Sequence, residues 1–226
     1  MQHIPKYADN KHIKEEIDNY TYILCSQKDL PLKNEIKSIA KYIIFLKEYA
    51  ENHDKKHYKQ YMIFDLLTVM HSLTQTSKRH VYYNLRSFIE NVVRTILDFA
   101  DDDETGVRKL FEAIEKKYEK SANILSIVEF LNGEYGKYCD YVHSNQKAGV
   151  TIHLYYTEIL SNDDLNEHTL RSIIRNLLTM LQKVTELFLY IEADFIEGIF
   201  HRRKQELNYL IGANRFQLFK DTIKST

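Results

Sequence analysis

The segment Tyr135–Ser144 places several side chains that could do chemistry close together. It holds a cation, a carboxylate, three tyrosines and a histidine, and Lys137, Asp140 and His143 recur at spacings of three. On a helix, this spacing keeps the three side chains along one side. A histidine moves protons near neutral pH, and a nearby cation holds a phosphate while charge develops on it. These residue types are the minimum needed to cleave RNA without a metal ion.

A second charged pattern lies earlier in the chain, where Arg86, Glu90 and Arg94 recur every four residues. Ladders of this kind usually form surface ion pairs worth about 0.2–0.5 kcal/mol each. If this ladder is half-buried against residues 134–143, its charges would instead orient His143. Both interpretations are compatible with the sequence.

Each candidate also has a purely structural explanation. His143 would cap the last carbonyl groups of a helix that stops at Ser144–Asn145, and the tyrosines would lie at the edge of the core. Base stacking would require that the tyrosines face an open groove. His53 and His57 stand one helical turn apart, but their charged neighbours indicate a solvated helix junction. We therefore predict no metal site and no cofactor.

The same segment resembles the HEPN superfamily, compact helical bundles whose nucleolytic members carry an arginine, four to six intervening residues and then a histidine. Lys137 and His143 match this spacing, with a lysine in place of the arginine. The segment Leu85–Asn91 looks like the charged helix that precedes this motif in HEPN-like proteins of bacterial phage-defence systems.

The resemblance implies an RNA target and an active site formed between two copies of the motif across a homodimer. Lysine supplies a point charge and lacks the two-pronged guanidinium group, and Arg86 or Arg94 of the neighbouring charged ladder could stand in for the missing arginine. The site residues expected on this basis are His143 as acid and base, Lys137 and Arg86 as phosphate contacts, Glu90 as the orienting group, and Arg94, Asp140 and Tyr141 as further binding residues.

The elements that must position these residues are predicted to be helices, because apolar residues recur at spacings of three and four along most of the chain. Asn132-Gly133 predicts an interruption, and the alternation over 150–156 resembles a short strand in an excursion or hairpin spanning 145–163. The predicted helices are Lys11–Cys25, Ile36–Ala50, Tyr58–Leu73, Arg79–Phe99, Val107–Lys120, Ser121–Leu131, Glu134–His143, a long helix Leu170–Ile199, and two shorter ones at the end.

Composition favours one all-α domain over residues 1–226, a helical bundle with its core at about 11–200 and short C-terminal helices in 202–226. The chain has 44% hydrophobic residues but 6 Gly and 2 Pro, and no linker-like stretch divides it. No run of eighteen apolar residues occurs, so we expect no membrane span. Cys25 and Cys139 form no close pair, which fits a reducing cytoplasm.

Two functions remain open at this stage. A net charge of −1 argues against a basic face that coats nucleic acid, but it allows a local basic site. The first hypothesis is therefore a HEPN-like effector of a bacterial antiviral defence or toxin system that acts on RNA as a dimer. The second is a non-catalytic helical adaptor that dimerises, through apolar surface left over on the long helix, or docks on a larger partner protein.

Overall fold

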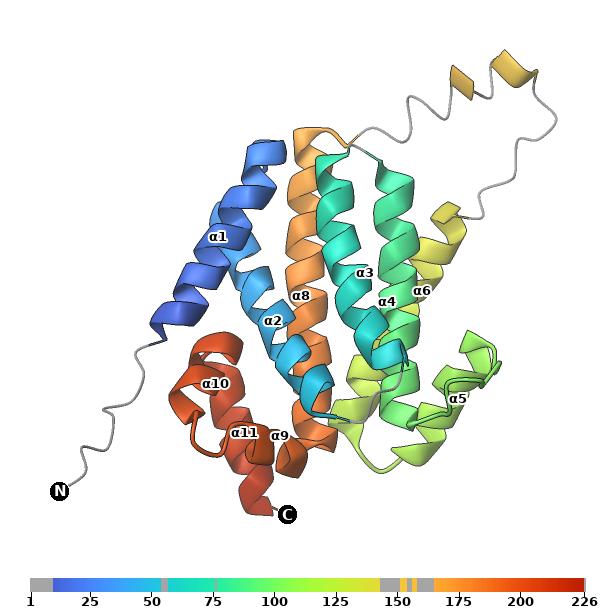
Figure 1. Cartoon of the computed structure of the whole chain (residues 1–226). Helices are drawn as coiled ribbons and strands as arrows, with labels where there is room; N and C mark the ends of the chain where they lie inside the picture. Colours follow the sequence, from blue (N-terminus) through green and yellow to red (C-terminus); the bar gives the residue numbers. More distant parts are fainter. Residues whose placement is uncertain are drawn as a thin grey trace.

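In the computed structural model, the chain is α-helical, and the described residues are 10–53, 57–75, 77–142, 151–153, 156–157 and 165–225 (Figure 1). Among these residues there is no strand, and none of the helices combines the length and hydropathy needed to cross a membrane. The helices are α1 (Lys11–Gln27), α2 (Lys33–Asn52), α3 (His57–Thr74), α4 (Lys78–Leu97), α5 (Val107–Lys117), α6 (Ala122–Val142), α8 (Glu167–Ile191), α9 (Ala193–Ile199), α10 (Lys204–Ile211) and α11 (Ala213–Ser225).

Polar caps and left-handed residues set several helix boundaries. The Ser77 hydroxyl accepts a hydrogen bond from the His80 amide at 3.3 Å, and Asn166 Oδ1 accepts one from the Thr169 amide at 2.9 Å. These side chains satisfy amides in the first turns of α4 and α8, which otherwise lack partners. Asp98 ends α4 with a φ of 56°, in the left-handed conformation common after a helix.

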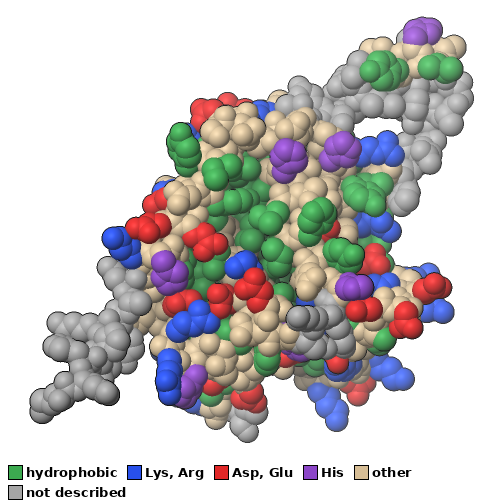
Figure 2. Space-filling model, viewed as in Figure 1, with side chains coloured by type: hydrophobic (Ala, Val, Ile, Leu, Met, Phe, Trp, Pro, Cys, Tyr) green, Lys and Arg blue, Asp and Glu red, His purple; other side chains and the backbone are tan. Residues whose placement is uncertain are grey.

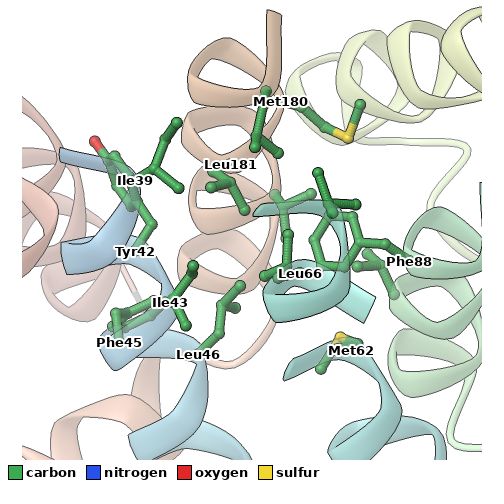
Figure 3. Packing of buried hydrophobic residues seen from close by; sticks show 14 of the residues in the cluster. Ile39, Tyr42, Ile43, Phe45, Leu46, Met62, Leu66, Phe88, Met180 and Leu181 are labelled. Carbon is green, nitrogen blue, oxygen red and sulfur yellow. The ribbon is translucent and has the colours of Figure 1, made fainter. Parts of the chain in front are cut away.

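The apolar stripe predicted for the second helix is buried, as its spacing indicated. Ile36, Ile39, Ile43 and Leu46 of α2 are all buried in the core. Figure 3 shows side chains from α2, α3 and α4 meeting in front of α8, which contributes Met180 and Leu181. One cluster of buried hydrophobic residues includes members of every described helix.

The interruption predicted at Asn132-Gly133 is wrong, because α6 runs without a break from Ala122 to Val142. Glycine in a helix costs roughly 1 kcal/mol relative to alanine, which tertiary packing easily outweighs. Leu131 and Glu134, on either side of Gly133, are both buried. The packing of both halves of α6 on the core therefore decides its conformation.

The long helix predicted to reach Ile199 ends instead at Ile191, and α9 follows after a bend at Glu192 with φ −124° and ψ 27°. The bend keeps aromatic residues of both α8 and α9 in contact with the same buried side chain of α2, the ring of Tyr49. The Tyr49 ring centroid lies 4.6 Å from that of Phe188 and 5.6 Å from that of Phe195. An apolar stripe continues across such a bend, so periodicity alone does not show it.

The strand-like alternation over 150–156 does not give a strand in the described residues. Ile152, His153, Tyr156 and Thr157 have helical backbone, and the Thr157 hydroxyl donates to the His153 carbonyl at 2.9 Å. Most of the predicted excursion 145–163 lies outside the described residues.

The two short closing helices are confirmed as α10 and α11, which cluster with α9 at the foot of α2 and α8 (Figure 1). α2 packs on both α8 and α10. Arg203 Nη2 lies 2.8 Å from Glu48 Oε2, and Arg215 Nη1 donates to the Tyr42 hydroxyl at 3.1 Å. The C-terminal helices therefore complete the packing around α2, although they are far from it in the sequence.

Candidate functional site

A groove of about 570 Å³ lies where α4, α6 and α8 meet. Each helix contributes one cation to the described lining, and the walls carry aromatic rings from α4 and α6. The cations are Lys78, Lys137 and Arg175, and the rings are Tyr82, Tyr138 and Tyr141. Two residues expected from the sequence, Lys137 and Tyr141, thus lie in one cavity.

A buried carboxylate, Glu134, organises the floor of this groove. Its side chain is 5% exposed, and it accepts hydrogen bonds from Lys137 Nζ at 2.6 Å, Asn176 Nδ2 at 2.7 Å and the Tyr138 hydroxyl at 2.9 Å. Lys137 and Tyr138 lie three and four residues beyond Glu134, so one helical face carries all three. Asn176 arrives from α8, so the carboxylate joins α6 to α8.

Burial and hydrogen bonding act in opposite directions on the charge of Glu134. Burial raises the pKa of this carboxyl, but hydrogen bonds from Lys137, Asn176 and Tyr138 outweigh it, and the pKa lies below its ordinary value. Burial, followed by the nearby Glu134 charge, raises the pKa of both Tyr138 and Tyr82. The floor therefore holds one carboxylate among neutral phenols near neutral pH.

The tyrosines form a small aromatic cluster along one wall. The Tyr82 and Tyr138 rings stack with centroids 5.2 Å apart, and Tyr141 meets Tyr82 edge-on at 4.8 Å. Lys78 Nζ lies 4.8 Å from the centroid of the Tyr141 ring. This contact is a cation–π interaction, which places a positive charge beside an aromatic surface.

Arg86 contacts a different face of α6. Its Nε donates to Cys139 Sγ at 3.1 Å, and its guanidinium carbon lies 5.2 Å from the centroid of the Tyr135 ring. The ladder does touch the 134–143 segment here, as the functional interpretation required. However, Arg86 lies outside the described lining of the groove, so the structure does not bring it together with Lys137.

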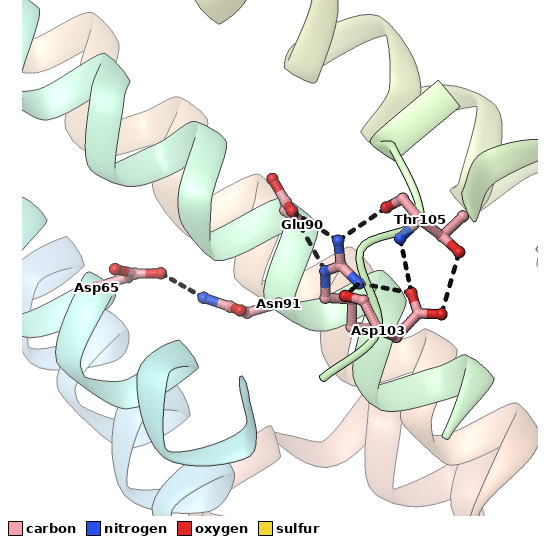
Figure 4. A network of polar contacts seen from close by, with 6 residues as sticks. Asp65, Glu90, Asn91, Asp103 and Thr105 are labelled. Carbon is pink, nitrogen blue, oxygen red and sulfur yellow. Dashed lines mark hydrogen bonds and ion pairs between the residues drawn. The ribbon is translucent and has the colours of Figure 1, made fainter. Parts of the chain in front are cut away.

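Arg94 and Glu90 hold a loop in place (Figure 4). The Arg94 guanidinium donates to Glu90 Oε1 at 3.1 Å, to Asp103 Oδ1 at 3.0 Å and to the Thr105 carbonyl at 2.8 Å. Asp103 also accepts from the Thr105 amide at 3.0 Å. All three Arg94 nitrogens donate within the protein, since Nε also bonds Glu90 at 3.2 Å. These two residues therefore fasten the 98–106 loop to α4.

The remaining predicted residues lie near the end of α6 or beyond the described part. The Asp140 side chain is exposed and lies outside the described lining of the groove. His143 lies outside the described residues. It follows Val142, whose carbonyl accepts a hydrogen bond from Arg79 Nη2 of α4 at 3.1 Å. The end of α6 is thus tied to α4 at the residue directly before His143.

The two histidines at helical spacing have separate polar partners. His53 Nδ1 lies 2.6 Å from Lys59 Nζ, while the His57 amide donates to Asp101 Oδ1 at 2.9 Å. Within the described residues, no group of three or more His, Cys, Asp or Glu side chains is arranged to hold a metal.

Sequence reasoning missed several residues of the groove, among them Lys78, Glu134, Arg175 and Asn176. Glu134 had a detectable signal, because a carboxylate three residues before Lys137 is a common helical ion pair. Asn176 lies off the apolar stripe of the long helix, so its polar side chain did not stand out in the sequence. Lys78 and Arg175 carry no such signal, since exposed cations are frequent on helices.

Comparison of the chain with protein-family models, curated proteins and solved structures found no match. The HEPN resemblance therefore stays a prediction that rests on Lys137, His143 and the Leu85–Asn91 segment. The groove shares Lys137 with this resemblance, but it also depends on α8 residues that the resemblance does not include.

Proposed function

We propose that the groove between α4, α6 and α8 binds single-stranded RNA, and that the chain is a HEPN-like effector of a bacterial defence or toxin system. The observation that carries this proposal is the position of Lys78, Lys137 and Arg175 on three helices around one aromatic wall. Lys and Arg contact phosphates, and unpaired bases stack on tyrosine rings. A site of this size fits a short single-stranded segment rather than a duplex.

The net charge of the chain supports a local site of this kind. With 31 basic and 32 acidic residues, the surface as a whole does not attract polyanions. Binding would then depend on the few cations of the groove, and its salt dependence would be shallow. This differs from proteins that neutralise many phosphates along an extended basic face.

The catalytic part of the proposal assigns the proton transfer to His143. The histidine would take the proton of a ribose 2′-hydroxyl as that oxygen attacks the adjacent phosphorus, and would return a proton to the departing 5′-oxygen. The products are a 2′,3′-cyclic phosphate and a 5′-hydroxyl end, so the step consumes no water and requires no metal ion. Lys137 would stabilise the charge on the phosphate oxygens during the attack.

The second candidate function is a non-catalytic adaptor, and the Lys137–Glu134 contact favours it. Lys137 Nζ lies 2.6 Å from a buried carboxylate, so part of its charge is neutralised within the protein. A phosphate would have to share this ammonium group with Glu134. The Lys137 side chain is nevertheless 72% exposed, which leaves the ammonium open to a ligand.

RNA binding tests the first part of the proposal. Fluorescence anisotropy with a labelled single-stranded RNA should show binding by the wild type and weaker binding by Lys137→Gln and Arg175→Gln. Each substitution should reduce the slope of log affinity against log salt by about 0.7, the value for one phosphate contact in a single strand. Arg108→Gln is the matched control, because Arg108 is 93% exposed and lies on α5, away from the groove. Equal affinities for all four proteins would contradict the assignment of the groove.

Cleavage and toxicity test the catalytic part. Wild-type protein should cleave RNA in the presence of EDTA and leave cyclic phosphate ends, and its expression should slow bacterial growth. His143→Ala should lose both effects while retaining RNA binding. If wild type and His143→Ala behave alike in cleavage and in toxicity, the non-catalytic adaptor is the better function.

A further inference from the structure

The exposed face of α3 carries large apolar side chains. Tyr61, Phe64 and Leu67 follow at spacings of three and are 54%, 64% and 42% exposed. Figure 2 shows hydrophobic and histidine side chains along α3, with Lys, Arg, Asp and Glu lying mainly over other parts of this view. A surface helix ordinarily presents its charged residues to water and its apolar residues to the core.

The charged residues of α3 point the opposite way. Its Lys and Asp residues, Lys59 and Asp65, are 1% and 6% exposed. Lys59 Nζ lies 3.7 Å from Asp98 Oδ1, and Asp65 Oδ2 accepts a hydrogen bond from Asn91 at 2.8 Å. Neither the lysine nor the aspartate of α3 is therefore presented to solvent.

We propose that this α3 face is the interface through which two copies of the chain associate, with α3 packed on α3 about a two-fold axis. In a two-fold arrangement, if one residue of the first copy contacts a second residue of the other copy, the same contact occurs with the copies exchanged. Phe64, in the middle of the apolar stripe, lies nearest the axis, while Tyr61 of one copy meets Leu67 of the other. An uncharged face can meet itself without like-charge repulsion, and it offers little to a partner recognised by charge.

The area of the stripe fits the centre of such an interface. Its three side chains expose roughly 300 Å² per copy, given the typical surface of such residues. A stable interface buries about 800 Å² on each side, with an apolar centre and a polar rim. His57, Gln60, Thr68 and His71 lie on the same helical face and would supply a polar rim.

The long helix, where the sequence placed the dimer contact, offers less exposed apolar surface than α3. α8 leaves no large hydrophobic side chain exposed in the described part of the chain, because its wide stripe is used inside the bundle. The described lining of the groove comes from α4, α6 and α8, so association through α3 leaves each groove within one copy, unlike the two-copy site that the HEPN resemblance implies. The two proposals therefore fail or succeed separately.

The test is the mass of the full chain in solution, measured by light scattering after size exclusion over a hundredfold range of concentration. Wild type should approach twice the 27.0 kDa of one chain. Phe64→Glu would place two carboxylates beside the axis and should weaken association by roughly a hundredfold or more. Tyr22→Glu is the matched control, since Tyr22 is 77% exposed on α1 beside Lys33 and Lys37 of α2.

Circular dichroism shows whether each variant is folded, and Leu67→Lys replaces Phe64→Glu if the latter unfolds. In a Cys25→Ser, Cys139→Ser background, Phe64→Cys should form a disulfide-linked dimer on mild oxidation. The proposal is overturned if wild type stays monomeric at every concentration, which would leave the face to a different partner protein. It is also overturned if the folded α3 variants remain as dimeric as Tyr22→Glu. RNA binding by Phe64→Glu should match the wild type.

Discussion

The substitution Glu134→Gln tests the role of the buried carboxylate with little change in shape. Glutamine keeps one oxygen acceptor but loses the negative charge that three donors share. Tyr138 and Asn176 would then compete for a single neutral acceptor inside the protein. The substitution should therefore destabilise the fold.

The size of the effect follows from the exposure of the three donors. A hydrogen bond to a charged group contributes about 1.5–3 kcal/mol, against about 0.5–1.5 kcal/mol for a neutral pair. The bond from Lys137 is discounted, because that side chain is 72% exposed and its pairing is screened by water. The two buried bonds lead us to expect a loss of about 2 kcal/mol in the free energy of unfolding.

Urea unfolding followed by far-UV circular dichroism measures this loss. With a slope of about 2 kcal/mol per molar urea, the midpoint should fall by about 1 M. Because the pKa of Glu134 is lower in the folded state than in the unfolded state, its stabilisation is present above the unfolded-state pKa of about 4.3. That stabilisation is lost as the pH falls through the folded-state pKa. The difference between wild type and Glu134→Gln should therefore shrink in acid.

Glu129→Gln is the control, because Glu129 is an exposed residue of the same helix and its substitution should change stability by less than about 0.5 kcal/mol. The reasoning is refuted if Glu134→Gln unfolds at the same urea concentration as Glu129→Gln at neutral pH. A difference that stays constant down to strongly acidic pH would also refute it, since the effect would then not come from the carboxylate charge.

Two further predictions concern stability. Arg94→Lys keeps the charge but loses the fork that bonds Glu90, Asp103 and Thr105, so unfolding should become easier by about 2 kcal/mol and amide exchange in 98–106 should accelerate. Arg108→Lys should change neither quantity. Gly133→Ala should stabilise the protein by about 0.5–1 kcal/mol, because the position is helical and a new Cβ would meet nothing within 4 Å. A lower unfolding midpoint in Gly133→Ala would contradict this account.

Helical periodicity in the sequence was enough to predict most of the helices. Ile36, Ile39 and Ile43 recur as one stripe, and the structure buries them all. Errors occurred where distant contacts decide the local conformation. Gly133 stays helical because the residues around it are buried, and the bend at Glu192 follows from packing on Tyr49.

The sequence predicted only those parts of the candidate site that lie on a single helix. The residue types and spacing along α6 led us to predict Lys137 and Tyr141 as site residues, and both line the groove. The contribution of Asn176 could not be predicted, because its bond to Glu134 spans 42 residues of sequence. For Arg94, the sequence showed the ladder spacing on its own helix, but it did not predict the hydrogen bonds to the 98–106 loop.

The dependence of α2 on the C-terminal helices has a consequence for synthesis on the ribosome. α2 emerges early, but its neighbours α8 and α10 begin at Glu167 and Lys204. Until these segments are translated, the apolar stripe of α2 lacks much of its final cover. The nascent chain would therefore present a site for chaperones through much of translation, and a stop codon before α8 would leave a product prone to aggregate.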